Sequence, residues 1–152
     1  MEVATGQLDA ARKAYGQSLA IVERLAQADA ANTDWQRDLS VSYIKLGDVE
    51  VAAGKLDAAR KAYGQSLAIA ERLAQADVAN AGWQRDLLVS YTKLGDLLHK
   101  EGKPTEALEH FRKSQAISDR LVKLDPANAI WKNDLDVVQA RIAELRAKTA
   151  GR

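Results

Sequence analysis

The chain repeats itself at a fixed offset of 48 residues. The segments GQLDAARKAYGQSLAI, GKLDAARKAYGQSLAI and GKPTEALEHFRKSQAI begin at Gly6, Gly54 and Gly102, and both intervals (54 − 6 and 102 − 54) equal 48. Residues 6–53 and 54–101 differ at 12 positions, whereas the third unit has diverged further. Such a period is typical of stacked supersecondary units, each of which buries its apolar side against its neighbours. We therefore expect one repeat domain over residues 1–152, with units 6–53, 54–101 and 102–149.

Each unit holds two amphipathic patterns. Apolar residues recur at three- and four-residue steps over residues 56–73 and again over residues 83–98, which is the spacing of one face of an α-helix. Asn32, Asn80 and Asn128 precede the Trp-containing stretches and are suited to cap a helix. Gly54 and Gly102 can adopt the positive φ that ends one. Short turns then make an all-α fold of three antiparallel hairpins, with six helices predicted at residues 7–28, 33–53, 56–77, 81–101, 104–124 and 128–148.

One series of residues is more specific than the helical pattern. Tyr43, Leu46–Gly47, Gly54, Ala59 and Tyr63 place an aromatic residue, Leu-Gly, a turn glycine, a small residue and a second aromatic in order. The next unit repeats the series with Tyr91, Leu94–Gly95, Gly102, Ala107 and Phe111.

This series resembles the signature of the tetratricopeptide-repeat family, and the resemblance extends over nearly the whole chain. It implies an α-α superhelix, a solenoid built from helical hairpins. Units of that family usually recur at about 34 residues. The longer period and longer helices found here resemble the long-helix tetratricopeptide class of large bacterial arrays.

The two ends of the chain differ in character. Aligning the repeats places residues 1–5 over residues 49–53, the tail of a Trp-containing helix, so we expect the chain to be a piece excised from a longer protein; a native start with an irregular first unit is the alternative. The helix predicted at 7–28 has a neighbouring hairpin on one side only, and we expect it to mediate a homodimer. Its apolar residues are Leu8, Ala11, Tyr15, Leu19, Val22 and Leu25. The last helix gains charge at Arg141, Arg146 and Lys148 and is expected to be a solvent-facing cap.

Composition excludes several classes of function. The chain has 22 Lys and Arg against 21 Asp and Glu, so no basic excess favours nucleic acid or an anionic membrane. It has no cysteine, which excludes thiolate chemistry. The sequence has neither a membrane-spanning apolar run nor a signal-peptide core, and the default location is the cytoplasm.

We expect no enzymatic activity, no cofactor and no metal. His99 and His110 are the two histidines; they could approach each other across a hairpin, but a metal site or a hydrolytic triad needs a further partner. Trp35, Trp83 and Trp131 recur at one helical phase, and we interpret them as packing anchors in equivalent surroundings rather than as ligand-stacking residues.

The resemblance also implies where a partner binds. In the tetratricopeptide family the first helix of each hairpin lines a concave groove that holds an extended peptide or a partner helix. The positions of this sequence that it assigns to the groove are Val41, Ile44, Lys45, Asp48, Val89, Thr92, Lys93, Asp96, His99, Lys100, Arg141 and Glu144.

A basic residue is followed three positions later by an acidic one in all three copies, at Lys45/Asp48, Lys93/Asp96 and Arg141/Glu144. Two interpretations remain open: intrahelical ion pairs on a solvated face, or a groove with a cationic and an anionic stripe. Some relatives capture carboxylates with paired Lys and Asn, but Asp48 and Asp96 would repel them, so we do not expect that activity. The predicted function is a protein–protein interaction scaffold; the alternative is a structural spacer or self-assembling segment of a larger bacterial signalling protein.

Overall fold

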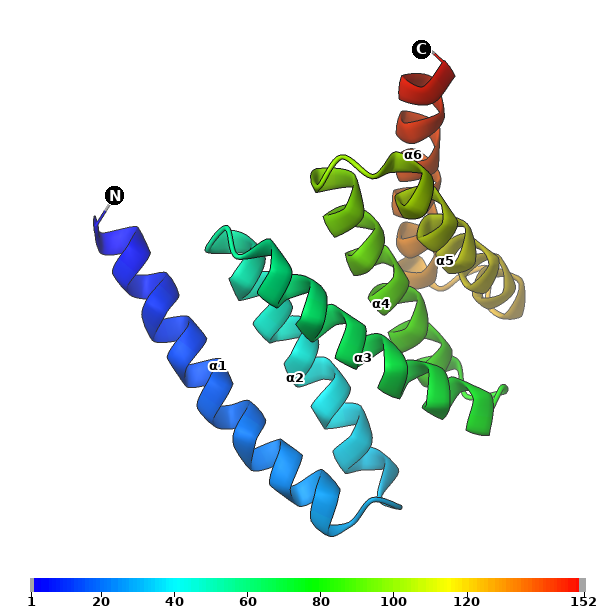
Figure 1. Ribbon diagram of the computed structural model, residues 1–152. Helices are drawn as coiled ribbons and strands as arrows, with labels where there is room; N and C mark the ends of the chain where they lie inside the picture. Colours follow the sequence, from blue (N-terminus) through cyan, green and yellow to red (C-terminus); the bar gives the residue numbers. More distant parts are fainter. Residues whose placement is uncertain (1, 151–152) are drawn as a thin grey trace. The chain divides into compact units, whose positions relative to one another are not determined.

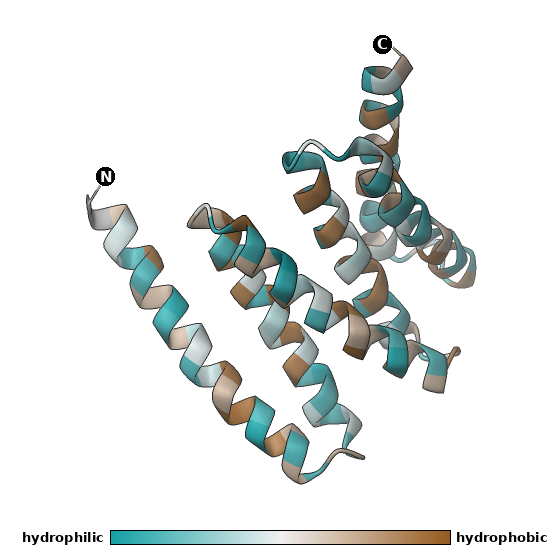
Figure 2. Ribbon diagram, in the orientation of Figure 1, coloured by the Kyte–Doolittle hydropathy of each residue, from teal (hydrophilic) through white to brown (hydrophobic). Residues whose placement is uncertain are grey.

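The computed structural model describes residues 2–150, with side chains from residue 4 onward. This part of the chain is entirely helical apart from short turns (Figure 1). Polar and apolar residues alternate along the helices at helical spacing (Figure 2), as amphipathic helices require. The six helices of the described residues are α1 (Glu2–Ala28), α2 (Thr33–Ala52), α3 (Leu56–Ala76), α4 (Ala81–Lys100), α5 (Pro104–Leu124) and α6 (Ala129–Ala150).

Local signals in the sequence explain where the helices begin and end. The side chain of Asn32 accepts the backbone N–H of Trp35 at 3.2 Å, and Asn80 and Asn128 do the same for Trp83 and Trp131 at 3.0 and 3.1 Å. Each bond satisfies a donor that the first turn of a helix leaves unpaired. Gly54 and Gly102 both adopt φ of 76° at the turns that follow α2 and α4. These predicted caps and turns are confirmed.

The start of α1 differs from the prediction. The repeat alignment placed residues 2–5 in the tail of another helix, with a turn near Gly6, but α1 runs without interruption from Glu2. Met1 lies outside the described residues. Gly54 and Gly102 reverse the chain because a complete helix precedes each of them and packs on the next. At Gly6 the backbone instead stays helical within α1.

The chain divides into two compact units, residues 1–76 and residues 77–152. In the first unit, α2 packs on both α1 and α3, and most extensively on α3. In the second unit, α5 packs on both α4 and α6, and most extensively on α4. The closest-packed hairpins are therefore α2–α3 and α4–α5, which carry the two copies of the tetratricopeptide-like series.

A glycine-on-aromatic contact forms the centre of both hairpins. In the second unit, a Cβ atom added to Gly95 would lie 2.6 Å from Cε1 of Phe111, and that ring is fully buried. In the first unit, Gly47 faces the ring of Tyr63 in the same way. The small residue allows the two helices to approach until the ring lies on the backbone. Leu-Gly and the second aromatic therefore act as one packing unit.

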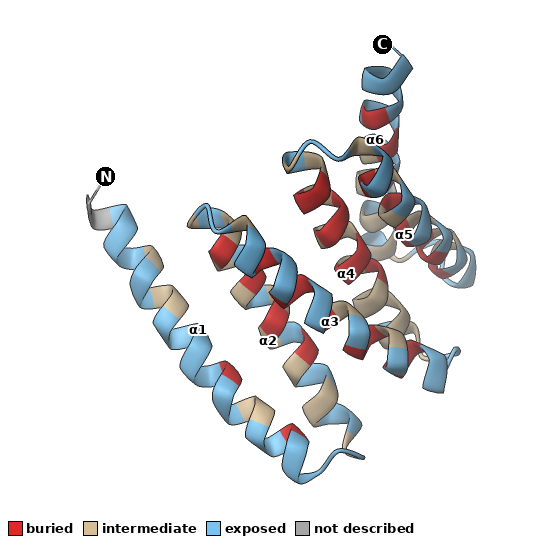
Figure 3. Cartoon of the chain, viewed as in Figure 1, coloured by how far each residue is buried: buried red, intermediate tan, exposed pale blue. Residues whose placement is uncertain are grey.

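One side of α1 is exposed where the corresponding side of α3 is buried. Tyr15 stands one period before Tyr63 (63 − 48 = 15), yet it is 37% exposed, whereas Tyr63 is 3% exposed. Ile21 and Leu25 are also exposed, at 52% and 38%. Most of α1 is accordingly drawn as exposed in Figure 3, and α4 and α3 are much more buried. The one-sided packing predicted for this helix is present within the first unit.

Polar contacts secure the covered side of α1 to α2. Arg12 Nε donates to Glu50 Oε1 at 3.0 Å, and the Glu50 side chain is only 8% exposed. The hydroxyl of Tyr43 donates to Glu23. Burial raises the pKa of Tyr43 above its ordinary value, and the neighbouring Glu23 carboxylate raises it further. A buried polar group of this kind needs its partner, so these bonds fix the register of α1 on α2.

Candidate functional site

Four of the six predicted groove residues of α4 border a common hollow in the second unit. Thr92, Lys93 and Asp96 lie three, four and seven residues after Val89, which puts all four on one face of α4. They border a hollow of about 200 Å³ together with Asp134 and Val137 from α6. Lys93 and Asp96 are half-buried, whereas Lys100, one turn further on, is exposed. The structure therefore brings together four of the predicted positions and adds two from the last helix.

Two ion pairs join α4 to α6 beside this hollow. Arg85 binds Asp134 through two hydrogen bonds, Nε to Oδ2 at 2.8 Å and Nη2 to Oδ1 at 3.3 Å. The bond to Asp134 raises the pKa of Arg85 above its ordinary value, while burial acts in the opposite direction. Arg141 Nε donates to Asp96 Oδ1 at 2.8 Å. Because both side chains of this second pair are 40% exposed, we expect it to contribute less than about 1 kcal/mol.

The second pair corrects one interpretation drawn from the sequence. Arg141 was paired there with Glu144 on its own helix, but it binds Asp96 on α4, and Glu144 binds Lys148 at 3.2 Å. The hydrogen bond from Lys148 lowers the pKa of Glu144. The charge of Asp96 is thus balanced across the helices, so the surface is less anionic there than the sequence indicates.

The equivalent positions of α2 belong to the first unit and differ in surroundings. Val41, Lys45 and Asp48 are exposed and Ile44 is half-buried. Asp48 accepts a hydrogen bond from the hydroxyl of Tyr63, so this carboxylate also supports the α2–α3 hairpin.

The two histidines have separate partners. His99 lines a hollow of about 210 Å³ with Leu145 and Lys148, and its Nε2 lies 3.4 Å from Lys148 Nζ. His110 packs edge-on against Tyr91 with ring centres 6.0 Å apart, and its Nδ1 lies 3.0 Å from the carbonyl oxygen of Glu106. Within residues 2–150, no cluster of three or more His, Asp and Glu side chains could hold a metal ion.

The pair Arg85–Asp134 was missed by the sequence analysis. A signal for it exists, because the Arg-Asp dipeptide of WQRD occurs at residues 37–38 and 85–86, and Asn133-Asp134 stands at the same place in the third copy. The arginine of one copy binds the aspartate of the next. A residue that recurs once per repeat can therefore mark a contact between repeats as well as one within a helix.

Both hairpins match a known family. Residues 39–77 and residues 88–121 match models described as tetratricopeptide repeat. The first match spans most of α2 and all of α3, and the second covers most of the α4–α5 hairpin. The two matches support a tetratricopeptide-repeat protein. No curated protein matches the chain.

Tetratricopeptide repeats generally mediate protein–protein interactions, and domains built from them are typically scaffolds without catalysis. In the part of the chain that the structure covers, no helix has both the length and the apolar character needed to cross a bilayer.

Proposed function

We propose that the chain is a non-catalytic scaffold that binds an extended peptide or a partner helix on the α4–α6 surface of its second unit. The observation that carries this proposal is the hollow formed by Val89, Thr92, Lys93 and Asp96 of α4 with Val137 of α6. Its lining combines the apolar side chains of Leu88, Val89 and Val137 with polar and charged groups that can orient a partner. This is the usual composition of a binding surface.

The charges on this surface limit which class of partner segment can bind. Asp96 is balanced by Arg141, while the ammonium groups of Lys93 and Lys100 lie on the same helix, one of them at the hollow. A partner segment with an apolar residue for the hollow and side chains of both charges beside it fits best, because Lys93, Asp96 and Asp134 all border the hollow. The repeat length and the long helices further suggest the long-helix class of bacterial arrays.

A peptide library tests this proposal. Random peptides displayed on phage are selected on the immobilised protein, and the affinities of the selected peptides are then measured by fluorescence anisotropy. We expect Lys93→Glu to weaken binding about tenfold, since reversing one charge at a half-buried contact costs on the order of 1.4 kcal/mol. We expect His99→Ala to weaken it a few-fold. Lys132→Glu, an exposed change elsewhere on the second unit, serves as the matched control and should have no effect.

Selected peptides that bind all three variants equally would exclude the α4–α6 surface. A library that yields no binding peptide at all would favour the spacer role instead.

Self-association is a second candidate, because α1 exposes apolar side chains that its counterparts bury. Ile21 and Leu25 are 52% and 38% exposed, whereas Ile69 and Leu73 at the same places in α3 are 6% and 8% exposed. A homodimer through residues 7–28 would cover this face. Light scattering at high concentration should then give twice the 16.6 kDa mass, and Ile21→Glu with Leu25→Glu should restore the monomer. A wild-type chain that stays at 16.6 kDa would rule the dimer out.

A further inference from the structure

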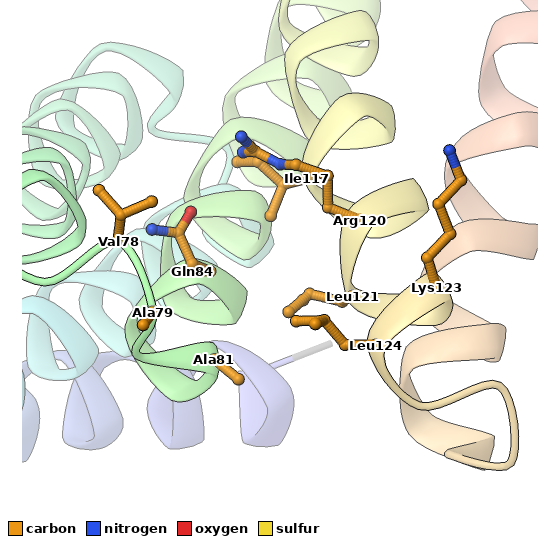
Figure 4. Close-up of a pocket in the computed structure, with 9 residues that line it drawn as sticks. All are labelled: Val78, Ala79, Ala81, Gln84, Ile117, Arg120, Leu121, Lys123 and Leu124. Atoms are coloured by element: carbon orange, nitrogen blue, oxygen red, sulfur yellow. The ribbon is translucent and has the colours of Figure 1, made fainter.

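The second unit has a further, apolar cavity at the other end of the α4–α5 hairpin from Gly102. The loop before α4 and the first turns of that helix form one wall, and the last turns of α5 form the other (Figure 4). The cavity measures about 310 Å³, at the lower end of the roughly 300–1,000 Å³ range of small-molecule sites. That space suits one or two large side chains better than a whole cofactor.

Some of the side chains that line this cavity are buried, and others are exposed to solvent. Ile117 and Leu121 are 4% and 2% exposed, but Val78 and Leu124 are 68% and 72% exposed. In Figure 4 the side chain of Leu124 points toward the space beside Ala81, and Val78 stands on the opposite wall. Two large aliphatic side chains exposed beside one opening can bury a third apolar group between them.

Comparison of the two repeats shows that several residues at this cavity differ from their counterparts in the first unit. Ile117, Arg120 and Leu121 have identical counterparts 48 residues earlier, at Ile69, Arg72 and Leu73. At two of the differing positions the second unit has a bulkier aliphatic residue, at one it has a cation, and at two it has a small residue in place of a hydroxyl or a carboxylate. It has Val78, Ala81, Gly82, Lys123 and Leu124 where the first unit has Ala30, Thr33, Asp34, Gln75 and Ala76.

Charge at the opening has one sign. Arg120 and Lys123 line the cavity, and none of the described residues that line it is acidic. Figure 4 shows Arg120 extending over Ile117 toward Gln84, whereas Lys123 points away from that wall. The N-terminus of α4 adds partial positive charge, and where α2 has Asp34 in its first turn to offset such charge, α4 has Gly82. The nearby Asp77 is engaged by the N–H of Ala79 at 3.2 Å.

We infer that this cavity is a docking site for an acidic amphipathic segment of a partner protein. A bulky aliphatic or aromatic side chain of that segment inserts between Val78 and Leu124 onto Leu121. A carboxylate beside it pairs with Arg120 at the rim. The site is separate from the α4–α6 hollow, so it holds or fails independently of the binding surface proposed above.

Isothermal titration calorimetry on the full chain tests this inference with two synthetic peptides. One is a helix-forming peptide in which leucines recur at helical spacing and every charged residue is glutamate; the other replaces each glutamate by lysine. We expect the glutamate peptide to bind at least tenfold more tightly than the lysine peptide. We expect Val78→Ala with Leu124→Ala to weaken its binding at least tenfold, because these changes give the cavity the alanines of the first unit.

Charge reversal and a second surface provide the controls. Arg120→Glu should weaken the glutamate peptide at least tenfold and narrow or invert its preference over the lysine peptide. Lys132→Glu, an exposed change on α6 outside both hollows, should leave its affinity unchanged. The alanine variant should keep the circular dichroism spectrum of the parent, since both side chains are largely exposed.

Three results would overturn the inference. The first is glutamate-peptide binding that the alanine variant leaves unchanged. The second is equal affinity for both peptides. The third is a dimer of the parent chain that the alanine variant abolishes, which would make a second copy of the chain the occupant.

Discussion

Tyr63→Ala is expected to lower the free energy of unfolding of the first unit by about 3–5 kcal/mol, whereas Tyr15→Ala should lower it by less than about 1 kcal/mol. The two residues are the same amino acid at the same place in the repeat (63 − 48 = 15). They differ in what covers them. Tyr63 is 3% exposed and lies on Gly47 of α2, while Tyr15 is 37% exposed.

The physical reason is the cavity that truncation leaves. Removing a buried ring loses its transfer free energy and creates a space that the neighbouring helices fill only in part. At Tyr63 that space would open between α2 and α3, and the hydroxyl bond to Asp48 would be lost as well. At Tyr15 solvent already reaches the ring, so little apolar contact is removed.

Urea unfolding of both variants and the parent checks this result, with the fluorescence of Trp35 as a probe within the first unit. To follow that unit alone, the other two tryptophans are replaced by phenylalanine in all three proteins. Comparable losses for Tyr15→Ala and Tyr63→Ala would mean that α1 is covered in solution, for example by a second copy of the chain. The same pair of variants thus reports on packing and on self-association.

Much of the fold could be predicted from the sequence because the signals were local. Asn32 and its two counterparts act through their own side chains on the next turn of backbone, and Gly54 and Gly102 supply a conformation that few other residues adopt. Five of the six helices consequently begin and end within two residues of the predicted bounds. The predicted start of α1 was wrong because the repeat alignment carried the turn at Gly54 and Gly102 over to Gly6, where the backbone is helical.

The sites were less predictable because they depend on side chains that meet across helices. The helical spacing of Val89, Thr92, Lys93 and Asp96 was enough to place them on one face of α4. That Arg141 reaches Asp96 on α4 rather than Glu144 on its own helix depends on the distance between the two helices. The cavity between Val78 and Leu124 joins residues 46 positions apart (124 − 78), neither of which is unusual alone. In the sequence, only a position-by-position comparison of the repeats indicates this cavity, because several of the residues around it differ from their counterparts.

Gly95→Ala is expected to lower the free energy of unfolding of the second unit by about 1–3 kcal/mol, although alanine is the better helix former by roughly 0.5–1 kcal/mol. The added Cβ would lie 2.6, 2.8 and 2.9 Å from three ring atoms of Phe111. That ring is fully buried among Leu98, Ala107 and Ile142, so it cannot move aside without disturbing the core.

Gly64→Ala is the matched control. Gly64 lies within helix α3 with open space where its Cβ would be, so the same substitution should stabilise the chain by roughly 0.5–1 kcal/mol. The two changes are therefore expected to have opposite signs, as measured by thermal or urea unfolding. A stabilising Gly95→Ala would show that the two helices are further apart than the glycine contact requires.

A double-mutant cycle identifies the ring as the cause. Combined with Phe111→Leu, which removes the ring edge that the new methyl group meets, Gly95→Ala should cost at least about 1 kcal/mol less than it does alone. The third repeat supports this argument, because the residue one period after Gly95 (95 + 48 = 143) is Ala143, and Ala143 is exposed. Alanine thus occurs at this position where the helix face is open to solvent, and glycine occurs in the two copies where an aromatic ring lies on it.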